Sequence, residues 1–400
     1  MGFMDYFKFL PVEITLDILT RLQAETVLDS KSVCKTWRDL ISYHPSFSKM
    51  HLDHHLNHAD SDSGKLSFVA LSDNEIGCSK FYFFEYNENH DQSTTQPIER
   101  IRRINLNTPF KPFRNVFSCN GLICLDRHPF LGAQPHCICN PITKEYIVLP
   151  EIKTGYCDPP WSVEFTSGFG YVSSTNEYKV VGIYRSEPRH MEVYIYTLGS
   201  GNGWRNVGKF SSQFSCTIHW DQGAFVNGVI YWMCNELEII LVFNLAEEKF
   251  SEALSPPPLP PDSIWQNNRI GVLNGFLFYA IHLVVEGAEC FDIWLLKKKD
   301  GKHGTKERDQ HQSLVWNKEF RVDDVELFGV TKSNGVLIYT NNYLNIYDTK
   351  ASTSKRIVDF KERFCAVIPH KNTLVSLTEL GEKDVKIMEC FKIEETESHD

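Results

Sequence analysis

The sequence predicts an α+β protein with its two kinds of structure segregated: a small N-terminal three-helix unit, then a large all-β domain, a β-propeller or an irregular relative of one. Apolar residues recur at spacings of three and four only up to about residue 56. Short β-branched or aromatic runs, divided by Gly, Asn, Pro and Ser, fill the chain beyond residue 80. Within them a Gly-led strand recurs at about 50 residues or multiples of that, the scale of a propeller blade.

The helical unit is predicted from two apolar stripes. The first contains Ile14, Ile18, Leu19 and Leu22, and the second contains Val27, Val33, Trp37, Leu40 and Ile41. Pro11 suits the first turn of a helix, where the N–H that proline lacks would have no partner. A unit of about 45 residues is near the lower size limit for independent folding, so we expect it to need a neighbour or a partner. We divide the chain into a helical module at residues 1–56, a linker at 57–80 and a β-domain at 81–395.

The β-domain is predicted from nine short apolar runs. They are residues 81–86, 122–125, 178–184, 191–198, 226–233, 239–245, 276–281, 336–340 and 344–347. The clearest copies of the repeated unit join Gly121 to Asn140, Gly228 to Asn244 and Gly335 to Asp348. No helical pattern interleaves the runs, which argues against a parallel α/β sheet. A pair of β-sandwiches is the alternative architecture.

Composition narrows the range of partners and compartments. The formal net charge is −10 at pH 7, so we expect no nucleic-acid partner. No stretch reaches the roughly 18 apolar residues of a membrane helix, so we expect no membrane partner either. The twelve cysteines lack regular spacing and no signal peptide precedes them. We interpret them as reduced thiols and expect a cytoplasmic location, a nuclear location or both.

Motifs for catalysis are missing from the sequence. It has no Gly-rich phosphate loop, no Gly-x-Ser-x-Gly elbow and no His-Glu-x-x-His helix. Cys137 and Cys139, with Cys124 and His136 nearby, lack the second cysteine pair of a structural zinc site, and buried thiols are the expected alternative.

A denser cluster of possible metal ligands follows the helical stripes. His51, His54, His55 and His58 include two pairs at i, i+4 spacing, which would share a helix face. Solvated histidines near a helix end are nevertheless commoner than zinc sites. We therefore predict no catalytic residue, no metal site and no cofactor.

Two motifs of the helical unit are shared with a known family. They are Leu10-Pro11-x-Glu13-Ile14-x-x-x-Ile18-Leu19-x-Arg21-Leu22, and Val33-Cys34-Lys35-x-Trp37-Arg38-x-Leu40-Ile41 with Pro45-x-Phe47. This region resembles an F-box, the helical module by which substrate receptors dock on the Skp1-type adaptor of cullin-based ubiquitin ligases. Two positions depart from the family: Gln23 stands where Pro is usual, and Asp29-Ser30 replace Arg-Phe type residues.

Further motifs resemble the F-box-associated domain of plant F-box proteins, a kelch-like interaction domain. They are Asn140-Pro141-x-Thr143 with Leu149-Pro150, Gly168-Phe-Gly-Tyr171, Asn176-x-Tyr178-Lys179-Val-Val, Val193-Tyr194 with Trp204-Arg205, and Asn227-Gly228-x-x-Tyr231-Trp232. With the F-box, the resemblance covers most of the chain.

The resemblance implies a substrate-recognition subunit of a Skp1/cullin/F-box E3 ubiquitin ligase, and not a catalyst. The F-box would bind the adaptor, and through it a cullin/RING module, while the β-domain would bind a target protein for ubiquitination and degradation. The adaptor-binding residues implied are Leu10, Pro11, Ile14, Ile18, Leu22, Val33, Cys34 and Trp37. Trp37 is the best anchor by residue type. Two alternatives stay open: a kelch-type propeller metalloenzyme, and an F-box protein in an adaptor complex without cullin.

Three loop segments are candidates for contact with a substrate: residues 156–161, 185–190 and 297–309. Propellers usually bind through loops on one face or at the central channel. Residues 256–261 are a Pro-rich run that we expect to be a stiff connection between blades. The basic run from Lys297 to Arg308 is expected to be a solvated loop, with a nuclear import signal as the alternative.

Overall fold

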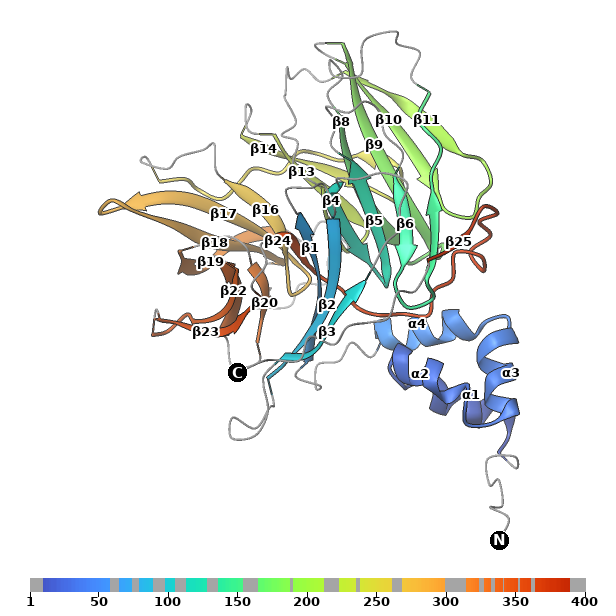
Figure 1. Ribbon diagram of the computed structural model, residues 1–400. Coiled ribbons are helices and arrows are strands. Elements are labelled where there is room, and N and C mark those ends of the chain that lie inside the picture. Colours follow the sequence, from blue (N-terminus) through green and yellow to red (C-terminus); the bar gives the residue numbers. More distant parts are fainter. Residues whose placement is uncertain are drawn as a thin grey trace, which may run out of the picture.

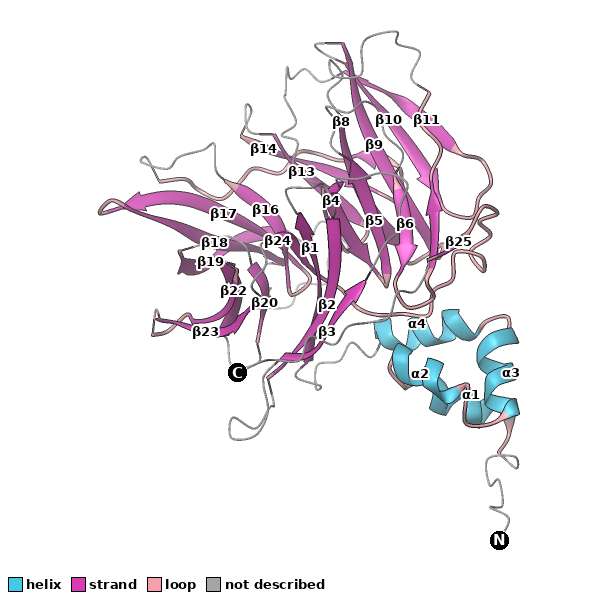
Figure 2. Ribbon diagram, in the orientation of Figure 1, coloured by secondary structure: helices cyan, strands magenta, loops and turns pink. Residues whose placement is uncertain are grey.

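The structure is a computed structural model that describes residues 10–57, 65–73, 79–88, 98–104, 113–127, 136–153, 165–187, 190–211, 223–234, 238–260, 268–298, 314–323, 327–331, 335–340, 342–351, 353–360 and 364–388. Helices gather at the N-terminus and strands form the remainder, as the sequence predicts (Figure 2). No helix among these residues has the length and apolar character needed to cross a membrane.

The described part of the N-terminal module contains four helices, one more than predicted. They are α1 (Val12–Thr20), α2 (Ala24–Ser30), α3 (Lys35–Tyr43) and α4 (Phe47–Asn57). Helix α3 is capped by Cys34, whose Sγ accepts the backbone N–H of Trp37 at 3.4 Å. Helix α4 was missed because it buries a histidine, His51, beside Phe47 and Leu52, and so carries no continuous apolar stripe.

The strands form six antiparallel sheets, each a blade of a propeller (Figure 1). From the inner to the outer strand, blade 1 consists of β24 (Phe364–Pro369), β1 (Lys65–Asp73), β2 (Ser79–Asn87) and β3 (Ile98–Ile104). In the same order, blade 2 consists of β4 (Phe113–Cys119), β5 (Leu122–Arg127), β6 (Cys137–Asn140), β7 (Glu145–Val148) and β25 (Lys386–Ile387). Blade 3 consists of β8 (Phe165–Val172), β9 (Glu177–Glu187), β10 (His190–Thr197) and β11 (Trp204–Ser211). Blade 4 consists of β12 (Ala224–Val226), β13 (Val229–Cys234), β14 (Ile239–Asn244) and β15 (Lys249–Phe250). Blade 5 consists of β16 (Arg269–Leu273), β17 (Phe276–Val285), β18 (Ala288–Lys298) and β19 (Leu314–Val322). Blade 6 consists of β20 (Leu327–Val330), β21 (Gly335–Thr340), β22 (Tyr343–Asp348) and β23 (Thr353–Asp359).

The inner strands close the ring. In the order β24, β4, β8, β12, β16 and β20, each contacts the next, and β20 contacts β24. Strand β24 comes from the C-terminal part of the chain and pairs with β1, so one blade joins the two ends of the β-domain. The propeller prediction is thereby confirmed and the two-sandwich alternative is wrong. The predicted linker at 57–80 is also wrong in part, since its residues 65–73 form β1, whose Phe68, Val69, Ala70 and Leu71 are buried on both faces.

Tight turns join the inner strand of a blade to its second strand. Asn120-Gly121, Asn227-Gly228 and Asn274-Gly275 have positive φ at both residues, between 46° and 86°. That conformation is favoured by Asn-Gly and matches the twist of a β-hairpin. The predicted strand at 226–233 therefore contains a turn, and it is two strands, β12 and β13. We call the side of the propeller that carries these three turns the module face, and the opposite side the far face.

Hydrogen bonds from three tryptophans, the partly buried Trp204 and Trp316 and the buried Trp232, link neighbouring blades. The indole N–H of Trp204, on the outer strand of blade 3, donates to the carbonyl of Pro150 at 2.7 Å, in the connection from blade 2. Trp316 does the same in blade 5, donating to Ser255 at 2.9 Å. In blade 4, Trp232 donates to the carbonyl of Ser167 in blade 3 at 3.1 Å. Since the Pro-rich run lies between β15 and β16, the predicted connection between blades is confirmed.

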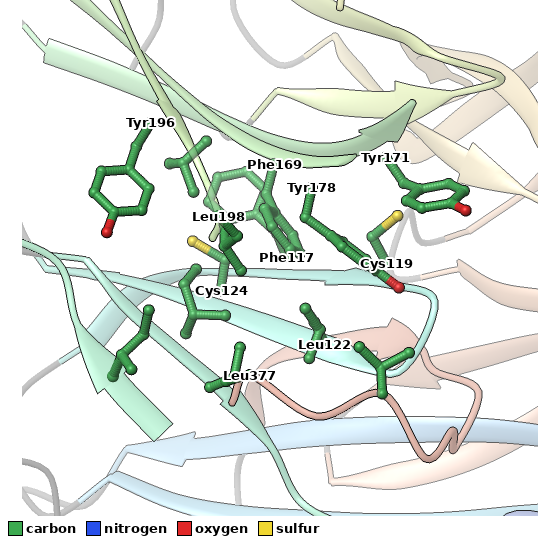
Figure 3. Packing of buried hydrophobic residues seen from close by; sticks show 14 of the residues in the cluster. Phe117, Cys119, Leu122, Cys124, Phe169, Tyr171, Tyr178, Tyr196, Leu198 and Leu377 are labelled. Atoms are coloured by element: carbon green, nitrogen blue, oxygen red, sulfur yellow. The ribbon is translucent and has the colours of Figure 1, made fainter. Parts of the chain in front are cut away.

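Apolar clusters between adjacent blades make up the core. One cluster lies between blades 2 and 3 and includes Phe117, Leu122, Cys124, Phe169 and Tyr178 (Figure 3). Leu52 of helix α4 belongs to the same cluster. The helical module is therefore packed against the propeller below blades 2 and 3.

Candidate functional site

The helical module exposes apolar side chains that its own core does not use. Ile14 and Ile18, one turn apart on α1, are 48% and 36% exposed, and Val33, between α2 and α3, is 55% exposed. Pro11 is exposed as well. The opposite face of α1 buries Leu16 and Leu19 in the module core. Because Ile14, Ile18 and Val33 are apolar and exposed to water, each is suited to contact with a protein partner.

The other predicted contact residues lie deeper. Leu10, Leu22 and Cys34 are partly buried, and Trp37 is only 8% exposed. Trp37 packs in the module core with Leu19 and Val27, so its first role is to hold the helices together. Contact of these residues with a partner stays a prediction.

Val12 and Tyr43 are among the exposed side chains that the sequence reasoning did not single out. Val12 begins α1 and is 47% exposed, and Tyr43 ends α3 and is 79% exposed. Spacing gave no signal that Val12 would be exposed, because Val12 stands four and seven residues before Leu16 and Leu19 and would share the face of α1 that they bury. Tyr43 had no signal either, since one aromatic residue at a helix end is equally suited to the core.

The helical module lies against the module face of the propeller, and no helix of the described residues covers the far face (Figure 1). The hydroxyl of Thr373 donates to the carbonyl of Asn120 in one of the module-face turns. Nearby, Lys371 donates from Nζ to the carbonyl of His55 in α4 at 3.1 Å. The two ends of the molecule are thus separated: exposed apolar helices at one end and the far face at the other.

Family models match both parts of the chain. A model described as F-box-like matches residues 7–51, and one described as F-box associated beta propeller domain matches residues 65–364. The chain is an F-box protein of the F-box associated β-propeller family. "F-box protein At3g07870" of Arabidopsis thaliana is 26% identical over 340 residues, covering 78% of this chain and 72% of the relative.

Another Arabidopsis thaliana relative, "F-box protein At3g20690", is 26% identical over 371 residues, covering 86% of both chains. Among solved structures, a putative 6-phosphogluconolactonase from Bacteroides uniformis is 9% identical, covering 76% of this chain and 99% of that chain, with a TM-score of 0.38. An F-box joined to a substrate-binding β-propeller is the arrangement of an F-box substrate receptor.

The histidine cluster of the F-box protein joins two helices. The Nε2 atoms of His51 and His55 lie 2.9 and 3.0 Å from the same carbonyl oxygen, that of Leu22, just beyond α1. A carbonyl only accepts hydrogen bonds, so both Nε2 atoms carry a hydrogen and neither is free to bind a metal. Burial lowers the pKa of His51 to about 4, which keeps its ring neutral. His58 lies outside the described residues.

The cysteine cluster is split between two faces of one sheet. Residues paired across two strands point to the same face, and Cys124 pairs with Ile138 whereas Cys137 pairs with Leu125. Cys124 therefore faces one side, and Cys137 and Cys139 face the other. Burial raises the pKa of Cys137 to about 12, as expected for a neutral thiol in the core. The described residues contain no group of three His, Cys, Asp or Glu arranged to hold a metal ion.

The expectation of reduced thiols holds for most of the described cysteines, with one correction. Cys34, Cys119, Cys124, Cys137, Cys139 and Cys290 are free. Cys234 is disulfide-bonded. Sequence spacing gave no signal for that bond, because the twelve cysteines follow no regular pattern.

The predicted substrate segments fall at different ends of the propeller. The 185–190 segment joins β9 to β10 at the far face, although residues 188–189 lie outside the described residues. Lys297 and Lys298 end β18 beside Phe276, which follows the Asn274-Gly275 turn, so this end of the 297–309 segment lies at the module face. Residues 156–161 and 299–313 are outside the described part of the chain.

Proposed function

We propose that this F-box protein is the substrate-recognition subunit of a Skp1/cullin/F-box E3 ubiquitin ligase. The F-box binds a Skp1-type adaptor, and through it a cullin/RING module, while the propeller binds a target protein for ubiquitination and degradation. The observation that carries the proposal is the exposure of the apolar side chains of Ile14, Ile18 and Val33 in a matched F-box, on a module whose helix α4 packs against the propeller.

In this role the protein contributes proximity. Holding a substrate lysine near a ubiquitin thioester makes the transfer effectively intramolecular, which lowers its entropic barrier. No side chain of this chain needs to titrate or to attack, so the proposal includes no catalytic residue and no cofactor. We also propose that the protein acts in the cytoplasm, the nucleus or both; the six free thiols of the described residues support this location, and the disulfide bond of Cys234 does not.

The exposed residues are the ones we assign to the adaptor contact. Burying a fully exposed Val or Ile side chain contributes about 1.5–3 kcal/mol, and Ile14 and Val33 are about half exposed, so each would contribute about 1 kcal/mol. Pro11 and Ile18 extend the same surface. Cys34 and Trp37 act from within, by capping α3 and filling the core.

Binding of the full-length chain to a purified Skp1-type adaptor tests the proposal. The double variant Ile14→Glu with Val33→Glu places two charges on the exposed surface and leaves the buried face of α1 unchanged. We expect it to lose binding by about 100-fold or more. The matched control is Val284→Glu, a similarly exposed apolar residue on the propeller, 46% exposed, which should bind as the wild type does.

Two results would contradict the proposal. One is a wild-type chain that binds no Skp1-type adaptor. The other is a folded double variant, shown by circular dichroism, that binds the adaptor as tightly as the wild type. Trp37→Ala is unsuitable for this test because Trp37 is a core residue whose loss would unfold the module.

A further inference from the structure

A C-terminal segment of the chain crosses from the propeller to the F-box and back. Strand β24, which closes the ring, ends at Pro369, and the chain continues as residues 370–388, which we call the strap. In Figure 1 the strap, in red, runs from β24 past α4 to β25. It has no helix, and its one strand, β25, pairs with β7 at the outer edge of blade 2.

Buried side chains of blade 2 hold the strap in place. The Glu145 carboxylate accepts the backbone N–H of Leu377 at 2.7 Å and the hydroxyls of Ser376 and Thr378 at 2.9 and 2.8 Å. The side-chain amide of Asn140 donates to two strap carbonyls, at 3.1 Å to Thr373 and 2.7 Å to Val375. These bonds satisfy backbone groups that a helix or sheet would otherwise satisfy, so the irregular strap has a defined path.

Glycines in blades 2 and 3 allow the strap to approach their backbone. A Cβ atom built on Gly121 would overlap the side chain of Thr373, and one built on Gly199 would overlap the carbonyl of Leu380. Beyond this contact, Glu382 accepts the backbone N–H of Gly199 at 2.7 Å. Because these two positions are glycines, the strap can lie directly against the backbone of blades 2 and 3 as they are arranged in the closed ring.

The other side of the strap completes the F-box. Leu374 is 7% exposed and is a member of the F-box core, although more than 300 residues separate it from the helices. Asn372 donates to the Glu25 carboxylate of α2, and Ser48 of α4 donates to Glu379. Neighbouring strap side chains face opposite ways: Leu374 lies among the helices, while Val375 and Leu377 lie in the cluster between blades 2 and 3. Figure 3 shows Leu377 in this cluster.

These contacts link ring closure to the F-box. The strap begins directly after β24, and β24 takes its place only when it pairs with β1 and closes the propeller. A module of about 45 residues has little core of its own, so the loss of one large core residue weakens it severely. We propose that the strap couples the two domains, so that the F-box core is complete only when the propeller ring is closed.

The coupling has a consequence that rests on the proposed function. A chain whose substrate domain is unclosed would lack Leu374 in its F-box and would present a weakened adaptor surface. The ligase would then recruit receptors with a closed propeller in preference to incompletely folded ones. The structural coupling itself does not depend on the identity of the adaptor.

Amide hydrogen exchange of the full-length chain tests the coupling directly. Exchange is measured at increasing urea concentrations below the global unfolding transition. We expect amides of α1–α3 to lose protection together with those of β1 and β24, with the same urea dependence, because one opening exposes both. Protection retained in α1–α3 after β1 and β24 have exchanged would overturn the proposal.

A pair of matched variants gives an independent result. Leu374→Ala should accelerate exchange in α1–α3 by about 30-fold or more, the effect of truncating a buried leucine. Leu380→Ala makes the same change in the same strap, but its side chain packs on the propeller cluster, so exchange in α1–α3 should change by less than about threefold. Equal effects of the two variants on α1–α3 would contradict the assignment of Leu374.

Binding to the adaptor is measured with the same two variants. Leu374→Ala should weaken adaptor binding by about tenfold or more, and Leu380→Ala should bind as the wild type does. A wild-type chain that binds no adaptor would refute the proposed function, while the exchange measurements would still decide the coupling. Wild-type adaptor affinity of Leu374→Ala would refute the recruitment of closed receptors.

Discussion

Replacement of Glu145 should loosen the strap more than any other single change in blade 2. Glu145 is 8% exposed and begins β7, and its carboxylate accepts four hydrogen bonds: one from a backbone N–H and three from hydroxyls, including that of Thr143 at 3.2 Å. In Glu145→Ala the buried N–H of Leu377 has no acceptor, which costs about 1–3 kcal/mol. The hydroxyls can turn toward other partners, so they add less. We expect a total loss of about 3 kcal/mol.

Two further variants show how much of the free-energy loss comes from individual hydrogen bonds to Glu145. Glu145→Gln keeps the shape but replaces one acceptor oxygen with an NH₂ group that faces donors, so it should cost about 1–2 kcal/mol. Thr143→Ala removes only the longest of the four bonds and should cost less than about 1 kcal/mol. Free energies of unfolding from urea titrations, followed by tryptophan fluorescence, give the three values. A Glu145→Ala stability within about 0.5 kcal/mol of the wild type would refute the role assigned to Glu145.

Three more predictions follow from the structure. Trp204→Phe keeps an aromatic ring but removes the five-membered ring with the N–H donated to Pro150, so it should lower the free energy of unfolding by about 1 kcal/mol or more. An unchanged urea midpoint would argue against this inter-blade bond. The free energy of unfolding should fall as the pH drops from about 6.5 toward about 4. Burial lowers the pKa of His51 and of His370 to about 4 in the folded protein, whereas both side chains bind protons near pH 6.5 in the unfolded chain. Equal urea midpoints at about pH 7 and about pH 5 would contradict this prediction. An alkylating reagent should modify the partly exposed Cys34 of the native protein and leave Cys137 unmodified until urea is added. Cys137 is buried, and burial raises its pKa to about 12. Labelling of Cys137 in the native protein would count against the burial of this sheet.

Local patterns in the sequence predicted the elements whose structure is local. The spacing of Ile14, Ile18, Leu19 and Leu22 predicted the first helix, because the period of a helix is visible within ten residues. Asn-Gly pairs carry a preference for positive φ, and three of them form the hairpin turns at Asn120-Gly121, Asn227-Gly228 and Asn274-Gly275. Even so, the strand predicted at 226–233 ran through the Asn227-Gly228 turn, because the apolar residues on either side of the turn look continuous.

Long-range pairing was beyond the reach of a single sequence. Strand β1 was assigned to a linker because polar residues surround it, although the buried run at 68–71 was a usable signal. The position of β24 beside β1 depends on closure of a ring, for which no pattern within β24 gives an indication. The strap is the extreme case: its hydrogen bonds go to Asn140 and Glu145, more than 200 residues away in the sequence.

The candidate adaptor surface was predicted as a set of residues but not as a surface. Family spacing identified Ile14, Ile18 and Val33, which are exposed, together with Trp37, which is buried. Residue type cannot separate these cases, because a tryptophan is equally suited to an interface and to a small core. Only the packing of the four helices shows which side chains remain for a partner.

The composition of the complex that the full-length chain forms in plant cells tests the central claim most directly. The tagged wild type and the Ile14→Glu, Val33→Glu double variant are purified side by side, and the bound proteins are quantified by mass spectrometry. The account predicts that a Skp1-type adaptor and a cullin accompany the wild type in near-equal amounts and that both are lost with the variant. Recovery of the adaptor without cullin, or of neither protein with the wild type, would contradict it.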